Sequence, residues 1–530
     1  MSDQQRMLLA AVLMAVVLFV SWTLSGRGGE SASEQRPARR EAPASVEEPA
    51  VQPETEEQPA VASDEGQADV AETLPEGAGR GSIELTVFDA AGTDTLVAAT
   101  LELSGGGFSR WMLHRYDNLN GGNGGRVDLA QSGMLPLRDA GGPLPFVHDG
   151  EETIDVIGGS RTVRLEGAGG VWREYTFHSG RYDFDVRQGG GENLGMVLDG
   201  GVLPVTEEGD KPADYFKAVW MANGDLEDEK TKDIEDPVER DEVDWAGVRT
   251  KYFTALIINS EEEEDVVFGP QEDASPSVAI AVSSARIYAG PVDYRRLGAL
   301  GVGADRMVDF GWPVIRWIGK IIFWFISTPL SFIGNWGVRI IILTIVLKTM
   351  LWPLTTKSFT SMQKMKEVQP KLKKLQEKYK SDPKRQQMEM QKLYKEEGVN
   401  PLGGCFPLLL QMPFFFAMYR VLQNMVELRG AEFVLWITDL SRPEILIPFG
   451  QSLLGLEGVG LLAVLMGVSM FIQQKMSVSD PSQKAMVYAM PVFMTWLFMR
   501  FPAGLTLYWF VNNLLTIGQQ ELIKKRLERA

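Results

Sequence analysis

Apolar stretches in the C-terminal half restrict the fold of this chain more than any other feature of its sequence. Residues 340–354 are apolar apart from Lys348 and two threonines, and four further apolar stretches follow between residues 404 and 518. A stretch of about 20 such residues is long enough to cross a bilayer as a helix. Several of these stretches are near the short limit, which favours helices that lean on one another in a locally thinned bilayer. They predict a polytopic α-helical membrane protein.

Another apolar stretch lies at the N-terminus. Met7–Leu24 is an uncharged run of 18 residues preceded by one basic residue, Arg6, which fits a signal peptide or a spanning helix. We favour a retained anchor, because no lipobox cysteine and no small-x-small cleavage site follows it. The next segment, up to residue 81, is rich in Pro, Glu, Ala, Ser and Gln, a composition that predicts a disordered linker.

Charged residues in the loops predict the orientation. Residues 357–395 contain twelve Lys or Arg, and the tail from Lys524 adds four more, whereas residues 427–457 contain only Arg429 and Arg442. The positive-inside rule therefore places the basic loop and the C-terminus in the cytoplasm. With six spans the N-terminus is cytoplasmic too, and the acidic domain between the first two spans lies outside.

Residues 82–290 carry a strand pattern. Ile83, Leu85 and Val87 alternate with polar neighbours at the period of two typical of half-buried strands, and Gly-rich turns follow. The pattern predicts a large antiparallel all-β sandwich. It must fold without an internal disulfide, since Cys405 is the only cysteine. Its histidines lack metal-ligand spacing, so we expect neither a metal nor a cofactor, and the net charge of −18 argues against a nucleic-acid partner.

The segment over residues 308–334 combines Trp and Ile with only a few cations. This composition is typical of an amphipathic helix that lies in the membrane interface. A seventh span is the alternative, but it would place the basic loop outside. We therefore favour the interfacial helix.

Lys348 lies near the middle of its apolar stretch, where a cation costs about 2.5–3.5 kcal/mol on translocon scales. Thr344 lies one helical turn earlier, on the same face. The six spans offer no acidic residue at mid-depth, so we expect water or an incoming acidic group as the partner of Lys348. Arg339, at the predicted outer end of this helix, is expected to snorkel. The other spans contribute the polar or aromatic candidates Gln411, Tyr508, Trp509, Asn512 and Asn513, of which Gln411 or Asn513 taken alone is better explained as interhelical glue.

The basic loop has the pattern of a helical hairpin. Ser381–Pro383 supplies a cap with Pro at the first position of the second arm. The hairpin is either a packed coiled coil with a solvated basic face or a mobile platform for a ribosome, a nascent chain or anionic lipid, and the two are compatible. The lysines expected to carry contacts are Lys364, Lys366, Lys371, Lys373 and Lys374.

Ordered motifs in the C-terminal part carry a family resemblance. They are Asn335–Gly337, the Lys348 helix ending in Pro353–Leu354, Asn400–Pro407, Gln411–Pro413 and Phe501–Leu505. In this order they resemble the YidC membrane-protein insertase family over about residues 311–527, while the β region matches by position, size and strand pattern. The resemblance implies a five-helix core around a hydrophilic groove, with Lys348 where relatives usually carry Arg. It also implies that the groove or its lipid-facing side is lined by Thr344, Met412, Phe415, Tyr508 and Trp509.

The function expected from this resemblance is insertion and assisted folding of newly made membrane proteins in the bacterial inner membrane, without chemical turnover. The expected partners are nascent membrane proteins and the Sec translocon. A secondary transporter that uses Lys348 as a substrate or proton site is the alternative, although no internal repeat or second buried ionisable group supports it. An enzyme is disfavoured, because no nucleophile motif is present.

The predicted fold class is therefore mixed, with six transmembrane helices, five of them in the core, and a periplasmic all-β super-sandwich. The predicted boundaries are 1–25 for the anchor, 26–81 for the linker, 82–305 for the β-sandwich, 308–334 for the interfacial helix, 338–356 for the second span, 357–400 for the cytoplasmic hairpin, 404–426, 458–475, 486–501 and 503–520 for the remaining spans, and 521–530 for the tail.

Overall fold

The protein is described by a computed structural model. The described residues are 78–117, 125–130, 134–135, 138–139, 142–190, 196–199, 216–259, 264–269, 277–280, 282–399, 406–453, 455–477 and 484–529. The predicted anchor over residues 1–25 and nearly all of the predicted linker lie outside them.

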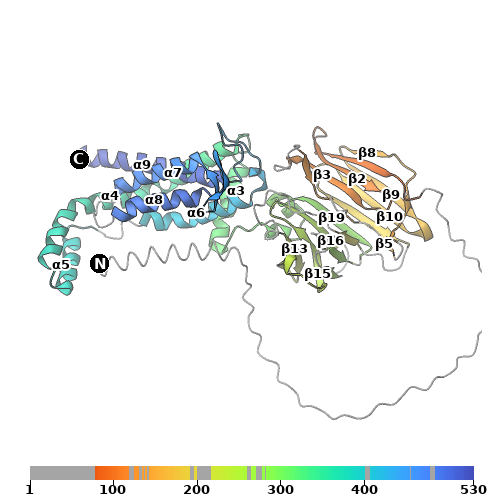
Figure 1. Ribbon diagram of the computed structural model, residues 1–530, viewed down its shortest axis with the longest axis horizontal. Coiled ribbons are helices and arrows are strands. Elements are labelled where there is room, and N and C mark those ends of the chain that lie inside the picture. The colour runs from red at the N-terminus through yellow and green to blue at the C-terminus, as the bar shows by residue number, and fades with distance from the viewer. Residues whose placement is uncertain are drawn as a thin grey trace, which may run out of the picture. The chain divides into compact units, whose positions relative to one another are not determined.

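The region from residue 82 to residue 291 is built from strands (Figure 1). The strands are β1 (Ser82–Phe88), β2 (Thr95–Glu102), β3 (Phe108–Asp117), β4 (Arg126–Asp128), β5 (Arg138–Asp139), β6 (Gly142–Pro143), β7 (Phe146–Val147), β8 (Thr153–Val156), β9 (Ser160–Gly167), β10 (Trp172–His178), β11 (Asp183–Gly189), β12 (Met196–Asp199), β13 (Lys217–Ala222), β14 (Asp225–Lys230), β15 (Val238–Arg249), β16 (Phe253–Asn259), β17 (Glu264–Phe268), β18 (Ser277–Ile280) and β19 (Ser284–Pro291).

Two main sheets hold these strands. The smaller sheet has the order β4-β3-β2-β1-β8, and the larger has the order β12-β18-β17-β15-β16-β19-β11-β10-β9-β7 with β13 and β14 attached through β15. The strand pairs described in both sheets are antiparallel except for β1 with β8. The prediction of a β-rich domain is therefore confirmed.

Alternation of side chains along the strands creates the core between the two sheets. In β1, Ile83, Leu85 and Val87 are buried, as the period of two predicts. From β3, the Phe108 ring lies 5.4 Å from the Phe184 ring of β11. Trp111 donates its indole N–H to the carbonyl of Ala289 in β19 at 2.9 Å. Aromatic packing and this buried hydrogen bond join the smaller sheet to the larger one.

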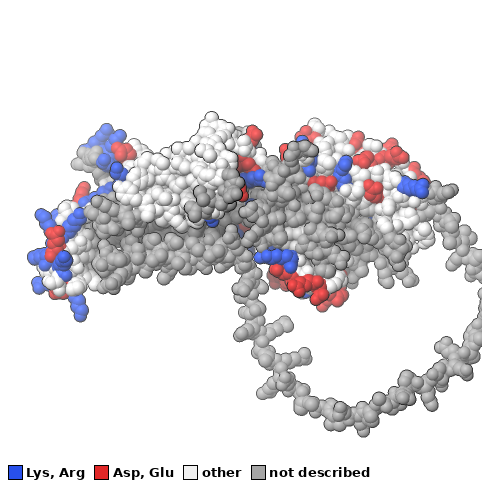
Figure 2. All heavy atoms as spheres, in the orientation of Figure 1, with Lys and Arg blue, Asp and Glu red and all other residues white. Residues whose placement is uncertain are grey.

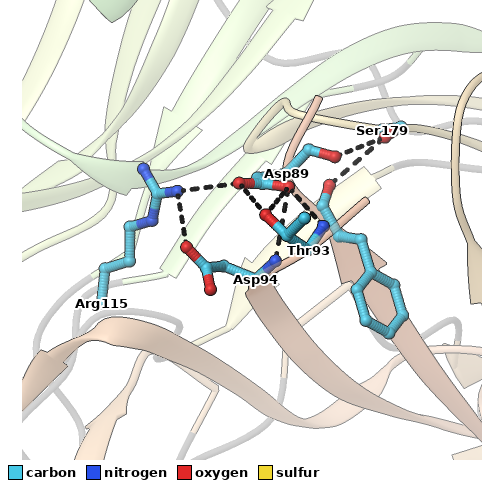
Figure 3. A network of polar contacts seen from close by, with 6 residues as sticks. Asp89, Thr93, Asp94, Arg115 and Ser179 are labelled. Carbon is cyan, nitrogen blue, oxygen red and sulfur yellow. Dashed lines mark hydrogen bonds and ion pairs between the residues drawn. The ribbon is translucent and has the colours of Figure 1, made fainter. Parts of the chain in front are cut away.

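The turn after β1 is fastened by the carboxylate of Asp89 (Figure 3). Asp89 accepts from the backbone N–H of Thr93 at 2.9 Å and pairs with Arg115 of β3 at 3.3 Å. Ser179, in the connection between β10 and β11, donates to the carbonyl of Asp89 at 3.0 Å. The hydrogen bond from the Thr93 N–H is the main cause that lowers the pKa of Asp89 below its ordinary value of 3.8.

Replacing Asp89 with Asn is expected to lower stability at neutral pH but not in acid. A lowered pKa means that the charged carboxylate stabilises the fold above pH 3.8, and that this contribution disappears as the pH falls through the folded-state value. The difference in urea midpoint between wild type and Asp89→Asn, measured on the full chain in detergent, should therefore shrink in that range. A difference that stays constant with pH would contradict this assignment.

The C-terminal region is helical, as predicted (Figure 1). The helices are α2 (Tyr294–Ala299), α3 (Pro313–Ser327), α4 (Trp336–Lys378), α5 (Pro383–Glu396), α6 (Phe406–Asn424), α7 (Leu461–Ser477), α8 (Lys484–Phe498) and α9 (Ala503–Arg529), with a hairpin of β20 (Ile447–Leu453) and β21 (Leu456–Val459) before α7.

Helix α4 runs without a break from the predicted second span into the predicted hairpin. It contains Pro353 and Pro370, and the hydroxyls of Thr355 and Thr356 donate to the carbonyl of Trp352 in the same region. Ser and Thr hydroxyls commonly bond back to a carbonyl three or four residues earlier in a helix. As the sequence predicts, Asp382 caps α5, with its carboxylate accepting from the backbone N–H of Arg385 at 3.1 Å.

Arg339 does not snorkel, so that prediction is wrong. Its side chain is 7% exposed and donates to the carbonyls of Ile326, Ser331 and Ile333 at 3.4, 3.1 and 2.6 Å. These carbonyls lie at the C-terminal end of α3 and in the loop after it, where no helical N–H is available. Arg339 thus holds the C-terminal end of α3 against the first turn of α4.

Candidate functional site

A polar pocket lies between α4, α6 and α9. The five α4 residues in its lining follow helical spacing and therefore share one face, and Tyr508 and Asn512 are one turn apart on α9. The pocket arises where these two faces meet, and it is small, with about 20 Å³ in which a water-sized molecule can sit. Its lining residues are Thr344, Leu347, Lys348, Leu351, Thr355, Gln411, Phe414, Tyr508 and Asn512.

Lys348 is 7% exposed, and its ammonium donates to the hydroxyl of Thr516 at 2.6 Å. The Thr516 hydroxyl donates in turn to the carbonyl of Asn512 at 2.7 Å, so its lone pairs are free to accept. Lys348 forms no ion pair with a carboxylate of the described residues. The charge is therefore held by a neutral oxygen, not by a fixed counter-ion.

Thr516 is the residue that sequence reasoning missed. Tyr508, Asn512, Thr516 and Gln520 are spaced by four residues, so they lie along one side of α9. This spacing is a signal that identifies Thr516 as part of the polar stripe. The spacing does not predict that Thr516 pairs with Lys348, because the two residues lie 168 positions apart in the sequence.

Further polar residues of α9 join helices together. The Gln519 amide donates to the Thr355 hydroxyl of α4 at 2.8 Å, and Asn513 donates to Ser469 of α7 at 3.0 Å. Hydrogen bonds of this kind stabilise helix contacts in membranes. The interpretation of Asn513 as a residue that joins helices is therefore confirmed. Gln411 of α6 hydrogen-bonds to Tyr508 of α9, which supports the same interpretation, and it also lines the pocket.

The remaining predicted groove residues lie outside the pocket lining. The Phe415 ring lies 4.9 Å from the Trp509 ring in an edge-to-face contact, and Phe498 of α8 lies 5.5 Å from Trp509. Met412 is half-buried on α6. The structure thus brings together Thr344, Lys348, Gln411, Tyr508 and Asn512 in the pocket, and joins Phe415 and Trp509 in an aromatic cluster.

The lysines of the predicted hairpin differ in their contacts. Lys364, Lys371, Lys373 and Lys374 are exposed, and Lys371 pairs with Glu397 at 2.5 Å. Lys366 is half-buried and donates to the carbonyl of Met476 at the end of α7, and burial is the main cause that lowers its pKa. Figure 2 shows Lys and Arg gathered over α5 and the adjoining part of α4.

Comparison with known proteins assigns the family. A family model described as "60Kd inner membrane protein" matches residues 329–530, and one described as "YidC periplasmic domain" matches residues 92–325. A curated protein of Pelobacter propionicus, named membrane protein insertase YidC, is 37% identical over 411 residues that cover 72% of this chain and 74% of the relative. The chain belongs to the YidC membrane protein insertase family. A relative with the same name from Wolinella succinogenes is 37% identical over 69% of this chain and 67% of its own length.

Family membership places this chain among inner membrane proteins with a periplasmic β domain. A solved structure titled "Active YidC insertase crystal structure with the first transmembrane domain resolved" aligns with 84% of this chain and 93% of its own, at 19% identity and a TM-score of 0.38. Within the described residues, α4 is the one helix that is long and apolar enough to cross a membrane by length and composition, and α7 and Val487–Phe498 are shorter apolar helices. The number of six spans stays a prediction.

Replacing Thr516 with Val is expected to destabilise this YidC family member by about 1.5–3 kcal/mol, because a buried ammonium loses its acceptor. Thr516→Ser keeps the acceptor and serves as the matched control. In a Lys348→Met background the cost of Thr516→Val should largely vanish, which a double-mutant cycle measures from thermal unfolding in detergent. If Thr516→Val lowered the free energy of unfolding equally in the wild-type and Lys348→Met backgrounds, the result would contradict a stabilising contact between Lys348 and Thr516.

Proposed function

We propose that this chain inserts newly made inner-membrane proteins, and helps them fold, by accepting their polar segments in the pocket at Lys348. The observation that carries the proposal is a buried ammonium whose partner is a neutral hydroxyl in a polar pocket. A carboxylate binds an ammonium more strongly than a hydroxyl does. An acidic segment of a client protein is therefore able to displace Thr516 and become the counter-ion of Lys348.

The work of such a pocket is to lower the cost of moving polar groups through the membrane. Thr344, Gln411 and Asn512 offer hydrogen bonds inside a region where an unpaired polar group is costly. The aromatic cluster of Phe415 and Trp509 offers an apolar surface for the client's membrane segment. Partitioning into lipid and the membrane potential, worth about 2.3 kcal/mol per charge per 100 mV, then give direction to an acidic tail that moves outward.

The proposed topology has six spans, with α4, α6, α7, α8 and α9 as the core and both termini in the cytoplasm. Contacts of α3 support its placement in the membrane interface, not across the bilayer. Asp309, just before α3, pairs with Arg420 in the last turn of α6 at 2.8 Å, and Arg339 in the first turn of α4 holds the other end of α3. Both ends of α3 thus meet the same side of the helical region.

The exposed lysines around α5 support a role for the hairpin on the cytoplasmic side. Lys364, Lys373 and Lys374 are exposed, so they are available to a ribosome, nascent chains or anionic lipid headgroups. We propose these as partners of the hairpin, and the Sec translocon as a second route by which clients arrive. Because α4 is continuous, movement of the hairpin would be transmitted directly to the Lys348 segment.

Depletion of the protein from cells, followed by protease protection of small single-span membrane proteins, tests the proposal. We expect stalled clients whose periplasmic segments stay protected from external protease, and recovery when the wild-type chain is restored. Vesicles that contain the purified chain alone should insert the same clients. Normal insertion in depleted cells, or solute flux into the vesicles without insertion, would contradict the proposal.

A further inference from the structure

Three large apolar side chains are displayed at the end of the helical region where α4 begins. Leu435 and Phe332 are the most exposed large apolar residues among those the structure describes, at 85% and 82%, and Val434 is 48% exposed. A single exposed Leu is ordinary. Here three such groups lie in two loops that hydrogen bonds from Asn335 to the carbonyls of Glu432 and Phe433 hold together. Exposed apolar groups gathered in this way are typical of an interaction site. We name Phe332, Val434 and Leu435 the apolar tip.

The backbone at the apolar tip is strained and firmly held. Leu435 has a φ of 58°, in the left-handed region that side-chain-bearing residues avoid. The loop is closed by hydrogen bonds from the Phe433 N–H to the carbonyl of Ile437 at 3.0 Å and from the Ile437 N–H to that of Val434 at 3.2 Å. Strain of this kind persists only where the surrounding contacts fix it. The structure therefore holds Leu435 outward instead of letting it fold back onto the helices.

The Asn335–Gly337 motif supplies the contacts that fix this loop. The Asn335 side chain accepts from the Val338 N–H at 3.1 Å to cap α4, and it donates to the carbonyls of Phe433 and Glu432 at 2.8 and 3.3 Å. At Gly337 a β-carbon would lie 2.1 Å from the Phe433 ring, so only glycine lets the loop approach this closely. The motif thus ties the loop to the first turn of α4.

Lipid is the occupant that the surroundings favour. The chain belongs to a family of inner membrane proteins, and α4 continues the apolar surface away from the tip with Ile345 and Val346, which are 44% and 41% exposed. Trp324, which is 57% exposed, lies in the last turn of α3, and the carbonyl of Ile326 in that turn accepts from Arg339 in the first turn of α4. Exposed Trp is typical of the membrane interface. A loop with free backbone groups cannot lie deep in hydrocarbon, so its depth is limited to the boundary between headgroups and acyl chains.

We infer that the apolar tip inserts into the lipid leaflet next to the start of α4 and anchors that end of the helix at the boundary between headgroups and acyl chains. Its assignment to the outer leaflet rests on the proposed orientation. The anchor fixes the depth of α4, and hence of Lys348, relative to the bilayer. The Asn335–Gly337 motif keeps the apolar tip rigid, because the Asn335 side chain bonds both to the tip loop and to the first turn of α4.

Depth-dependent quenching tests the inference. A cysteine is introduced at position 435 in a Cys405→Ser background and labelled with the fluorophore NBD, and the full chain is placed in nanodiscs, where both leaflets are accessible. Phospholipid with a spin label near the headgroup should lower the emission about twofold and more strongly than one labelled at the acyl terminus, as expected for burial to about 5–10 Å. Aqueous iodide should quench it far less than it quenches the same label at exposed Glu151 of the β domain.

A variant of Asn335 gives a second test of the inference. Asn335→Asp keeps the oxygen that caps α4 but loses the amide that donates to the loop, so quenching by the shallow spin label should fall by at least about half. Iodide quenching at position 435 as strong as at position 151 would overturn the inference, and so would shielding from both quenchers, which would indicate a protein cover. Client insertion is measured separately in the same preparations, so failure of the anchor and failure of the proposed insertase function are distinguishable.

Discussion

Replacing Lys348 with Met should reduce the insertion of clients with acidic tails by about tenfold or more, while clients with uncharged tails insert almost normally. A hydrogen bond between charged groups contributes about 1.5–3 kcal/mol, and ~1.4 kcal/mol corresponds to a factor of ten. Met fills nearly the same volume without the charge. The expected effect therefore comes from losing the counter-ion of the client, not from a cavity.

The measurement is protease protection of matched client pairs in vesicles that contain the purified variant. Lys348→Arg keeps a cation at the same depth and should retain most activity, whereas Lys348→Glu should be worse than Lys348→Met for acidic tails because like charges repel. Thr516→Ser serves as a control for disturbed packing, since it keeps both the ammonium and the hydroxyl that accepts from it. Equal insertion of acidic and uncharged tails by Lys348→Met would contradict the proposal that Lys348 acts as the counter-ion of acidic client tails.

Replacing Arg173 with Met should destabilise the β domain by about 2–4 kcal/mol. Arg173 of β10 is fully buried, and its guanidinium donates to Gln188 at 2.6 Å and to the carbonyl of Leu135 at 2.6 Å. No carboxylate among the described residues pairs with it. The guanidinium instead donates to neutral oxygens, and replacing Arg173 removes the donor to the buried Leu135 carbonyl.

Arg161→Met is the matched control, because Arg161 is exposed on the neighbouring strand β9 and its loss should change stability by less than about 0.5 kcal/mol. The denaturant midpoint of the β domain within the full chain, followed by proteolysis, gives the comparison. At a temperature where Arg173→Met stays folded, client insertion should be unchanged, since the pocket residues come from other elements. Similar midpoints for the two variants would show that the neutral oxygens do not depend on Arg173.

The features that could be predicted from sequence are those set by near neighbours along the chain. The alternation of Ile83, Leu85 and Val87 predicts a strand because successive side chains point to opposite faces. The Asp382–Pro383 pair predicts the start of α5 because a cap and a fixed φ act within one turn. Thr344 and Lys348 are predicted to share one helix face because they are four residues, about one turn, apart. Ordered motifs added the family, and with it the candidates Met412 and Phe415.

The partners of the buried charges could not be predicted, because each depends on which distant segments pack together. Arg339 looked free to reach water, but three carbonyls at the end of α3 surround it. Arg173 gave no signal in the sequence, since its acceptors come from other strands and loops. The display of Leu435 depends on Asn335, which lies about a hundred positions earlier.

Lys348 shows both what the sequence determines and what tertiary packing determines. Its place in an apolar stretch is a property of the sequence, and the cost of a charge at that depth already indicates function. The identity of its partner was decided by the packing of α9 against α4, which places the Thr516 hydroxyl 2.6 Å from the ammonium. Spacing along a helix fixes which face a residue occupies, but only tertiary contacts fix what that face meets. A residue's local periodicity and its cost of burial are thus contained in the sequence, whereas hydrogen-bond partners far along the chain are settled when the helices and sheets pack.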